Sequence, residues 1–116
     1  MEDKTLMLTL LFDFFGELLP QKQREYFDLY YNEDMSLSEI AELFGVSRQG
    51  VRDMIVRAEK TLTDYEEKTG VVRRALETRR RVDELMDILG RAEEKACGEV
   101  SELIGEARRG LCSLKG

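Results

Sequence analysis

The chain has 116 residues, of which 42% are apolar and 36% charged, and it carries a net charge of −6. This length suits one domain, or one domain with an appendage, and the acidity argues against a broad phosphate-binding surface. The absence of histidine and of a Cys-x-x-Cys pair excludes the usual zinc sites and every histidine-dependent catalytic arrangement. There is also no glycine-rich phosphate loop and no nucleophile motif, so we expect neither an enzyme nor a cofactor or metal site.

The N-terminal run TLMLTLLFDFFGELL predicts a helix over residues 3–17. It is too short to span a bilayer and is interrupted by Asp13 and Glu17, so we interpret it as a packing helix and expect no membrane association. Its apolar residues recur at helical spacing, and we expect the following ones to be buried: Leu6, Leu10, Phe14 and Leu18.

A second helix is expected after Pro20, because proline suits the first turn of a helix. Its sequence, QKQREYFDLYY, is rich in aromatic side chains. Such rings could stack on bases. We assign them to the core instead, because they lie beside the packing helix of the motif that follows.

The segment SLSEIAELFGVSRQGVRDMI, residues 36–55, predicts a helix-turn-helix. Ser36 and Glu39 form the S-x-x-E pattern of a capping box, and Gly45 suits a left-handed residue at the end of the first helix. Ser47 would cap a second helix from Arg48 to about residue 68. The residues that we expect to face inward on this second helix are Val51, Met54, Ile55, Ala58 and Leu62.

Two more helices are expected at about residues 72–89 and 91–112. The last one carries apolar residues at alternating spacings of three and four, as in a coiled-coil seam: Cys97, Val100, Ile104, Ala107, Leu111 and Leu114. Its glycines weaken it, so it needs a partner surface, either the rest of the chain or a second copy. On one helix the two cysteines would be about 22 Å apart, too far for a disulfide, which fits the reducing cytosol.

The densest basic run is RRALETRRR, from Arg73 to Arg81. It could contact RNA phosphates or an acidic protein. It could equally be a solvated helix face in which Glu77 pairs with Arg73 and Arg81 at i,i+4 spacing. The sequence leaves both interpretations open.

Residues 18–62 resemble region 4 of bacterial sigma factors. The resemblance rests on a Leu-Pro start, a helix, then Ser-x-x-Glu-Ile-Ala, Gly-Val-Ser, and a final Val and Arg-Ala in that order. The other parts of a sigma factor are missing from the chain. The resemblance therefore implies an all-α fold with a helix-turn-helix of the sigma region 4 type.

A resemblance over nearly the whole length is to the YlxM family. It rests on the apolar N-terminal helix, the segment YFDLYYNEDMSLSEIAELFGVSRQGVRDMIVRAEKTLTDYEEKTG and a charged helical tail. The family consists of small bacterial proteins described as helix-turn-helix DNA-binding proteins and associated with the signal recognition particle. The resemblance implies a cytoplasmic accessory or regulatory role in protein targeting.

We therefore expect a helix-turn-helix domain over residues 1–69 and a helical extension over residues 70–116 that packs on the N-terminal helix or dimerises. The expected partner is duplex DNA or signal recognition particle RNA, bound by a homodimer that gains from avidity. The alternative is a protein-interaction adaptor that binds the particle's GTPase or RNA, with the motif as scaffold only. In the first hypothesis, the nucleic-acid-binding residues are Ser47, Arg48, Gln49, Arg52 and Arg57.

Overall fold

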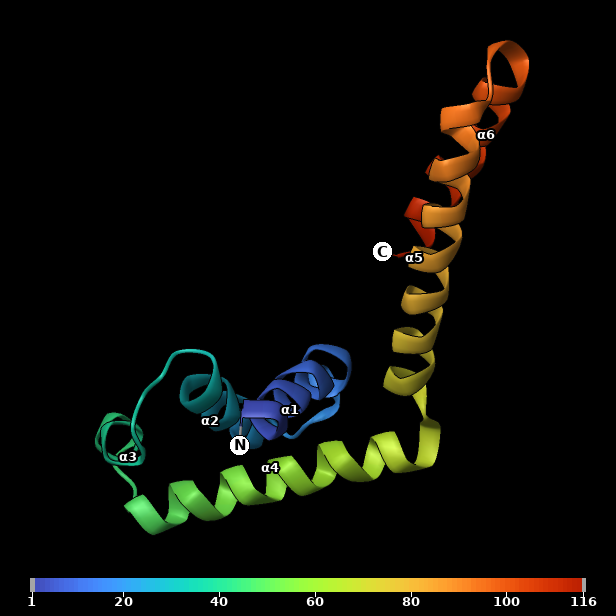
Figure 1. The fold of residues 1–116 in the computed structure, drawn as a ribbon. Coiled ribbons are helices and arrows are strands. Elements are labelled where there is room, and N and C mark those ends of the chain that lie inside the picture. Colours follow the sequence, from blue (N-terminus) through green and yellow to red (C-terminus); the bar gives the residue numbers. More distant parts are fainter. Residues whose placement is uncertain (1, 116) are drawn as a thin grey trace. The chain divides into compact units, whose positions relative to one another are not determined.

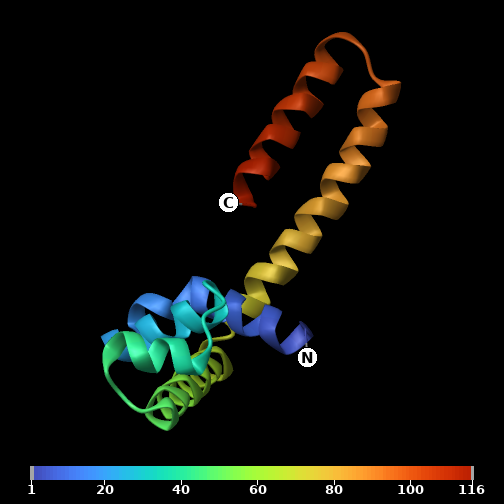
Figure 2. The same cartoon turned by 90° about the vertical axis from the view of Figure 1, so that its left-hand side faces the viewer.

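The computed structural model describes residues 2–115, and within that range the chain is all-α, as predicted. It divides into two compact units, Met1–Val72 and Arg73–Gly116, each described here by itself. Figures 1 and 2 show the helices. In chain order the elements are α1 (Glu2–Phe15), a 3₁₀ turn η1 (Gly16–Leu18), α2 (Gln21–Tyr31), α3 (Leu37–Phe44), α4 (Arg48–Thr69), α5 (Val71–Lys95) and α6 (Gly98–Leu114).

In the first unit, α1, α2 and α3 all pack against α4 (Figure 1). The residues of α4 that were expected to face inward do so: Val51, Ile55, Ala58 and Leu62 are buried and Met54 is half-buried. Long α4 is therefore the element on which the unit is assembled. Its core joins two clusters, one under α3 and one under α1.

The buried face of α1 differs from the predicted one. Leu8, Leu11 and Phe15 are buried, whereas Leu6, Phe14 and Leu18 are exposed and Leu10 is half-buried. The reason is that α1 is apolar on almost every side, so helical spacing fits two different stripes. Contact with α2 and α4 selects one of them.

The aromatic residues of α2 belong to the core, as predicted. Tyr26 and Phe27 are buried. The ring of Phe27 stacks on Phe12 at a centroid distance of 4.7 Å and lies 4.5 Å from the ring of Tyr31. The hydroxyl of Tyr31 donates a 2.7 Å hydrogen bond to Glu59 Oε2, which ties α2 to α4.

In the second unit, α6 runs back along α5 as a helical hairpin (Figure 2). The expected break at residue 90 is wrong, because α5 continues through Gly90 to Lys95. Gly98 makes the turn with a φ of +63°, which glycine adopts without strain. Cys97 therefore precedes α6, and both cysteines are exposed free thiols.

None of the helices in residues 2–115 has the length and apolar character needed to cross a membrane.

Candidate nucleic-acid interface

The turn between α3 and α4 is fixed by hydrogen bonds that the sequence predicted. At the start of α3, Ser36 and Glu39 form the full capping box, with N–O distances of 3.0 and 2.9 Å. At its end, Gly45 is left-handed, and the amide of Val46 donates to the carbonyl of Ala41 at 3.0 Å. Both ends of α3 are therefore closed, which fixes the point at which α4 begins.

Ser47 caps α4 as predicted, because its hydroxyl oxygen accepts a 2.9 Å hydrogen bond from the amide of Gly50. The amides of Arg48 and Gln49 are left at the exposed N-terminus of the helix. The positive end of the helix dipole thus faces outward beside Ser47.

Three of the five predicted site residues line one surface hollow of about 420 Å³. Arg48, Gln49 and Arg52 come from the first two turns of α4, and Leu37 comes from the first turn of α3. Arg48 and Arg52 are exposed, and within residues 2–115 neither guanidinium forms an ion pair. The hollow therefore presents two uncommitted cations with a polar amide beside them.

Gln49 is held by a neighbour one turn along α4. Its Nε2 donates a 2.8 Å hydrogen bond to Asp53 Oδ1. This bond orients the amide and leaves its carbonyl oxygen as an acceptor toward solvent. The second N–H of the same Nε2 also remains available to donate to a base.

Arg57, the fifth predicted residue, lies apart from the other four. It follows Arg48 by nine residues, so it is about 13 Å further along α4 and on the opposite side of the helix. The structure does not bring it to the hollow. Nine residues are about two and a half helical turns, so the helical spacing alone places Arg57 on the side opposite Arg48.

Sequence reasoning missed Leu37, the one apolar wall of the hollow. Its position directly after the capping residue Ser36 places it on the first turn of α3, where the second helix of such a motif begins nearby. Its position relative to the helix cap is the sequence feature that could have identified Leu37.

The unit that carries the hollow is acidic overall. Residues 1–72 carry eight basic and fifteen acidic side chains, a net charge of −7, whereas residues 73–116 carry ten and nine. On α3 itself, the pKa of Glu39 is lowered because its carboxylate accepts from the backbone amide and the side chain of Ser36. The carboxylate of Glu39 is thus ionised and committed to the cap.

The arginine run lies on the first turns of α5, and its residues are exposed. Arg81 pairs with Glu84 at 3.0 Å rather than with Glu77, so that part of the expected ion-pair pattern is wrong. Arg79 donates to the backbone carbonyl of Lys115 at 3.3 Å.

Comparison with known proteins identifies the family. The family model described as "Putative helix-turn-helix protein, YlxM / p13 like" matches residues 2–100. The chain belongs to this UPF0122 family. Both the resemblance to YlxM proteins and the helix-turn-helix are thereby confirmed.

Relatives in the UPF0122 family span most of the chain. A UPF0122 protein of Caldanaerobacter subterraneus subsp. tengcongensis is 47% identical over 89 residues, which covers 77% of this chain and 76% of the relative. One from Desulforamulus reducens is 41% identical and covers 94% of this chain and 85% of the relative. One from Bacillus cereus is 45% identical, with coverages of 92% and 96%.

Proposed function

We propose that this UPF0122 protein is a nucleic-acid-binding accessory protein that binds duplex DNA through the hollow at the start of α4. The observation that carries the proposal is the convergence of Arg48, Arg52 and Gln49 on one exposed hollow. Arginine suits the paired acceptors of guanine, and glutamine suits adenine. The capped N-terminus of α4, with Ser47, suits a phosphate.

Arg57 enters the proposal in a different role from Arg48 and Arg52. On the far side of α4 it suits a contact with the phosphate backbone at the flank, which positions the protein but reads no base. Its removal should weaken binding to all sequences by a similar factor, with a smaller loss than for the two arginines of the hollow.

The proposal includes a cytoplasmic homodimer that acts in the signal recognition particle pathway. Dimerisation supports DNA binding because the first unit is acidic and one module alone would bind weakly. The pathway assignment is supported by the resemblance to YlxM proteins, and particle RNA is included as a nucleic-acid partner for the same reason.

The test is fluorescence anisotropy of labelled random duplex DNA and of signal recognition particle RNA, titrated with the protein across a salt series. We expect duplex binding that weakens with salt and is lowered about tenfold or more by each of Arg48→Ala and Arg52→Ala. The matched control is Lys60→Ala with Lys68→Ala, which removes the same charge from α4 beyond its first three turns. Equal affinities of this control and of a variant that combines Arg48→Ala with Arg52→Ala would contradict the proposal.

A second candidate function is an adaptor that binds the particle's GTPase or RNA, with the helix-turn-helix as scaffold. The observation that favours it is charge: the unit with the motif has a net charge of −7, whereas five arginines and one glutamate lie within residues 73–81. This candidate predicts that Arg74→Ala with Arg80→Ala reduces partner binding, and that the Arg48/Arg52 variant does not. A pull-down with the purified GTPase and RNA distinguishes the two functions.

A further inference from the structure

The second unit leaves most of its apolar side chains uncovered. In residues 73–115 only Val82 is buried, and α6 has no buried residue at all. Val100, Leu103 and Leu114 are 56%, 57% and 65% exposed. A helix of this length draws most of its stability from packing an apolar face, so α6 lacks the contact that its sequence provides for.

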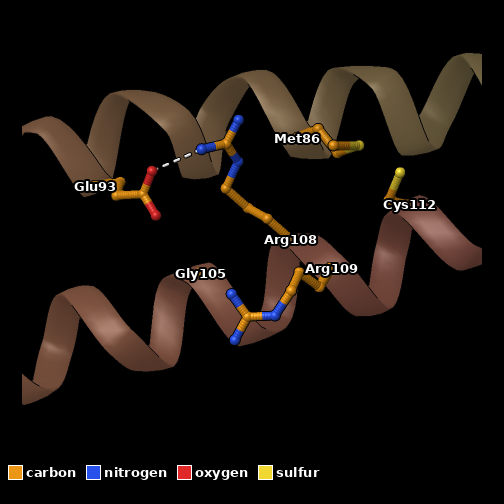
Figure 3. A pocket seen from close by; sticks show the side chains of 6 residues that line it. All are labelled: Met86, Glu93, Gly105, Arg108, Arg109 and Cys112. Atoms are coloured by element: carbon orange, nitrogen blue, oxygen red, sulfur yellow. Dashed lines mark hydrogen bonds and ion pairs between the residues drawn. The ribbon is translucent and has the colours of Figure 1, made fainter.

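Two ion pairs cross the contact between α5 and α6. Arg108 pairs with Glu93 at 2.6 Å, and Lys115 pairs with Asp83. Figure 3 shows this polar side of the hairpin, where Arg108 reaches across to α5 and a cavity of about 290 Å³ lies beside Gly105. The Nε atom of Arg108 is shielded and has no hydrogen-bond partner in the described residues, so the polar contact is incompletely satisfied.

The exposed apolar residues form two rows, one on each helix, and the row on α5 begins with half-buried Leu85. Along α5 the spacing is three and four, and along α6 it is three, four and seven, so each row keeps to one side of its helix. The rows consist of Leu85, Ile88 and Ala92 on α5, and of Val100, Leu103, Ala107 and Leu114 on α6.

Both rows lie on the same side of the hairpin. Successive residues of a helix are about 100° apart around its axis. Each row therefore lies roughly 110–130° around its helix from the side chains that face the other helix. Because α6 runs antiparallel to α5, the two rows lie on the same face of the hairpin. Arg109 and Cys112, which line the cavity in Figure 3, lie on the opposite face. The hairpin therefore has one polar and one apolar face.

We propose that the apolar face binds the same face of a second copy of this chain, so that two hairpins form a four-helix bundle. This inference rests on the homodimer of the proposed function and names the interface of that dimer. Two helices of which one has no buried residue are half of such a bundle, because each helix of a bundle packs against two neighbours. Three residues of the predicted coiled-coil seam, Val100, Ala107 and Leu114, then face the partner.

The charges at the edges of the apolar face identify a second copy as the occupant and fix its direction. The outer edge of α5 carries Arg91 and Lys95 near the turn of the hairpin, and Glu84, paired with Arg81, two turns earlier. Arg91 also pairs with Asp87 on its own helix. The outer edge of α6 carries Glu99 and Glu106. When the two-fold axis runs parallel to the helices, α5 of each copy faces α6 of the other, and basic edges meet acidic edges. A perpendicular axis would place α5 on α5, with like charges together.

The register of the hairpin supports this pairing. Because Glu93 is level with Arg108, Lys95 is level with about Glu106, and the two-fold axis preserves that level in the second copy. The face is about 25 Å long over α6 and about 20 Å across two helices. The flat projection of this face is about 500 Å², and the relief of its side chains raises the accessible area toward the roughly 800 Å² per partner of a stable interface.

The first experiment measures the dimer dissociation constant of the full chain by sedimentation equilibrium. We expect a dimer, with its dissociation constant raised about 100-fold or more by Val100→Glu combined with Leu103→Glu. Both side chains are already exposed in the single chain, so helicity by circular dichroism should remain. The matched control, Cys112→Glu on the opposite face of α6, should leave the dimer intact. A monomeric wild-type chain, or equal effects of both variants, would overturn the proposal.

The second experiment tests the arrangement by exchanging charges. Glu106→Lys alone should weaken the dimer about threefold to tenfold, and Lys95→Glu in the same chain should restore it. Failure of the double variant to recover would overturn the parallel two-fold axis.

DNA binding is measured separately on the same variants. The Arg48/Arg52 variant should still dimerise, and the Val100/Leu103 variant should lose avidity but keep the weaker binding of a single module. Loss of one property without the other therefore shows which of the two proposals has failed.

Discussion

Both units of this protein contain long amphipathic helices, which are used in different ways. In the first unit, α4 buries four side chains beneath three other helices. In the second, α6 buries none, and two ion pairs join this part of the chain to α5. An amphipathic sequence therefore specifies a helix in both units, but packing stabilises the helix only where its apolar face is covered.

The largest effect should come from the core of the first unit. Phe27→Ala removes a fully buried ring that stacks on Phe12, and we expect a loss of about 3–5 kcal/mol in the free energy of unfolding. Leu111→Ala truncates a half-buried side chain of α6 and should lower the free energy of unfolding by about 1–2 kcal/mol. Both are measured by denaturant unfolding at a concentration where the chain is monomeric. Losses of similar size would show that the difference in packing between the two units does not determine their stability.

A pair of glycine substitutions tests where the hairpin turns. Gly98→Ala should destabilise the second unit by about 1–2 kcal/mol, because alanine is strained at a φ of +63°. Gly90→Ala should instead stabilise α5 by up to about 1 kcal/mol, since its Cβ would meet only Arg108 at 3.9 Å. Hydrogen exchange of residues 73–115 reports both changes, and effects of the same sign would argue against this turn.

The hydrogen bond between α2 and α4 should contribute about 1 kcal/mol at neutral pH, measured as the loss on Tyr31→Phe. Burial, and then the bond to Glu59, raise the pKa of Tyr31 above its usual value. A raised pKa stabilises the fold below the unfolded value of about 10, and this contribution is lost as the pH rises beyond it. The difference between wild type and variant should therefore shrink above pH 10. A constant difference would show that the hydroxyl is not involved.

The smallest effect should come from the ion pair of Arg108 with Glu93. Both side chains are about one third exposed, so a double-mutant cycle with alanine should give a coupling of about 0.5 kcal/mol. Raising the salt concentration should reduce it. A coupling above about 2 kcal/mol would mean that the polar contact stabilises the hairpin as strongly as packing does.

Much of the helix-turn-helix could be predicted from local sequence. Ser36 with Glu39, Gly45 and Ser47 each act on backbone groups within a few residues, so their roles do not depend on the rest of the fold. The hollow was predicted in part: Arg48, Gln49 and Arg52 share it, but Leu37 was missed because it comes from another helix. Arg57 was grouped with them although it lies on the other side of α4.

The helices, their caps and the inward face of α4 follow from the amino-acid sequence alone. The reason is that they depend on contacts between residues close in sequence, or on a single unambiguous apolar stripe. Only the tertiary structure decided which of two stripes of α1 is buried, since both are apolar and only packing against α2 and α4 distinguishes them. The tertiary structure also shows that the chain turns at Gly98 rather than at Gly90, because the ion pair of Arg108 with Glu93 requires α5 to continue past Gly90 toward Lys95.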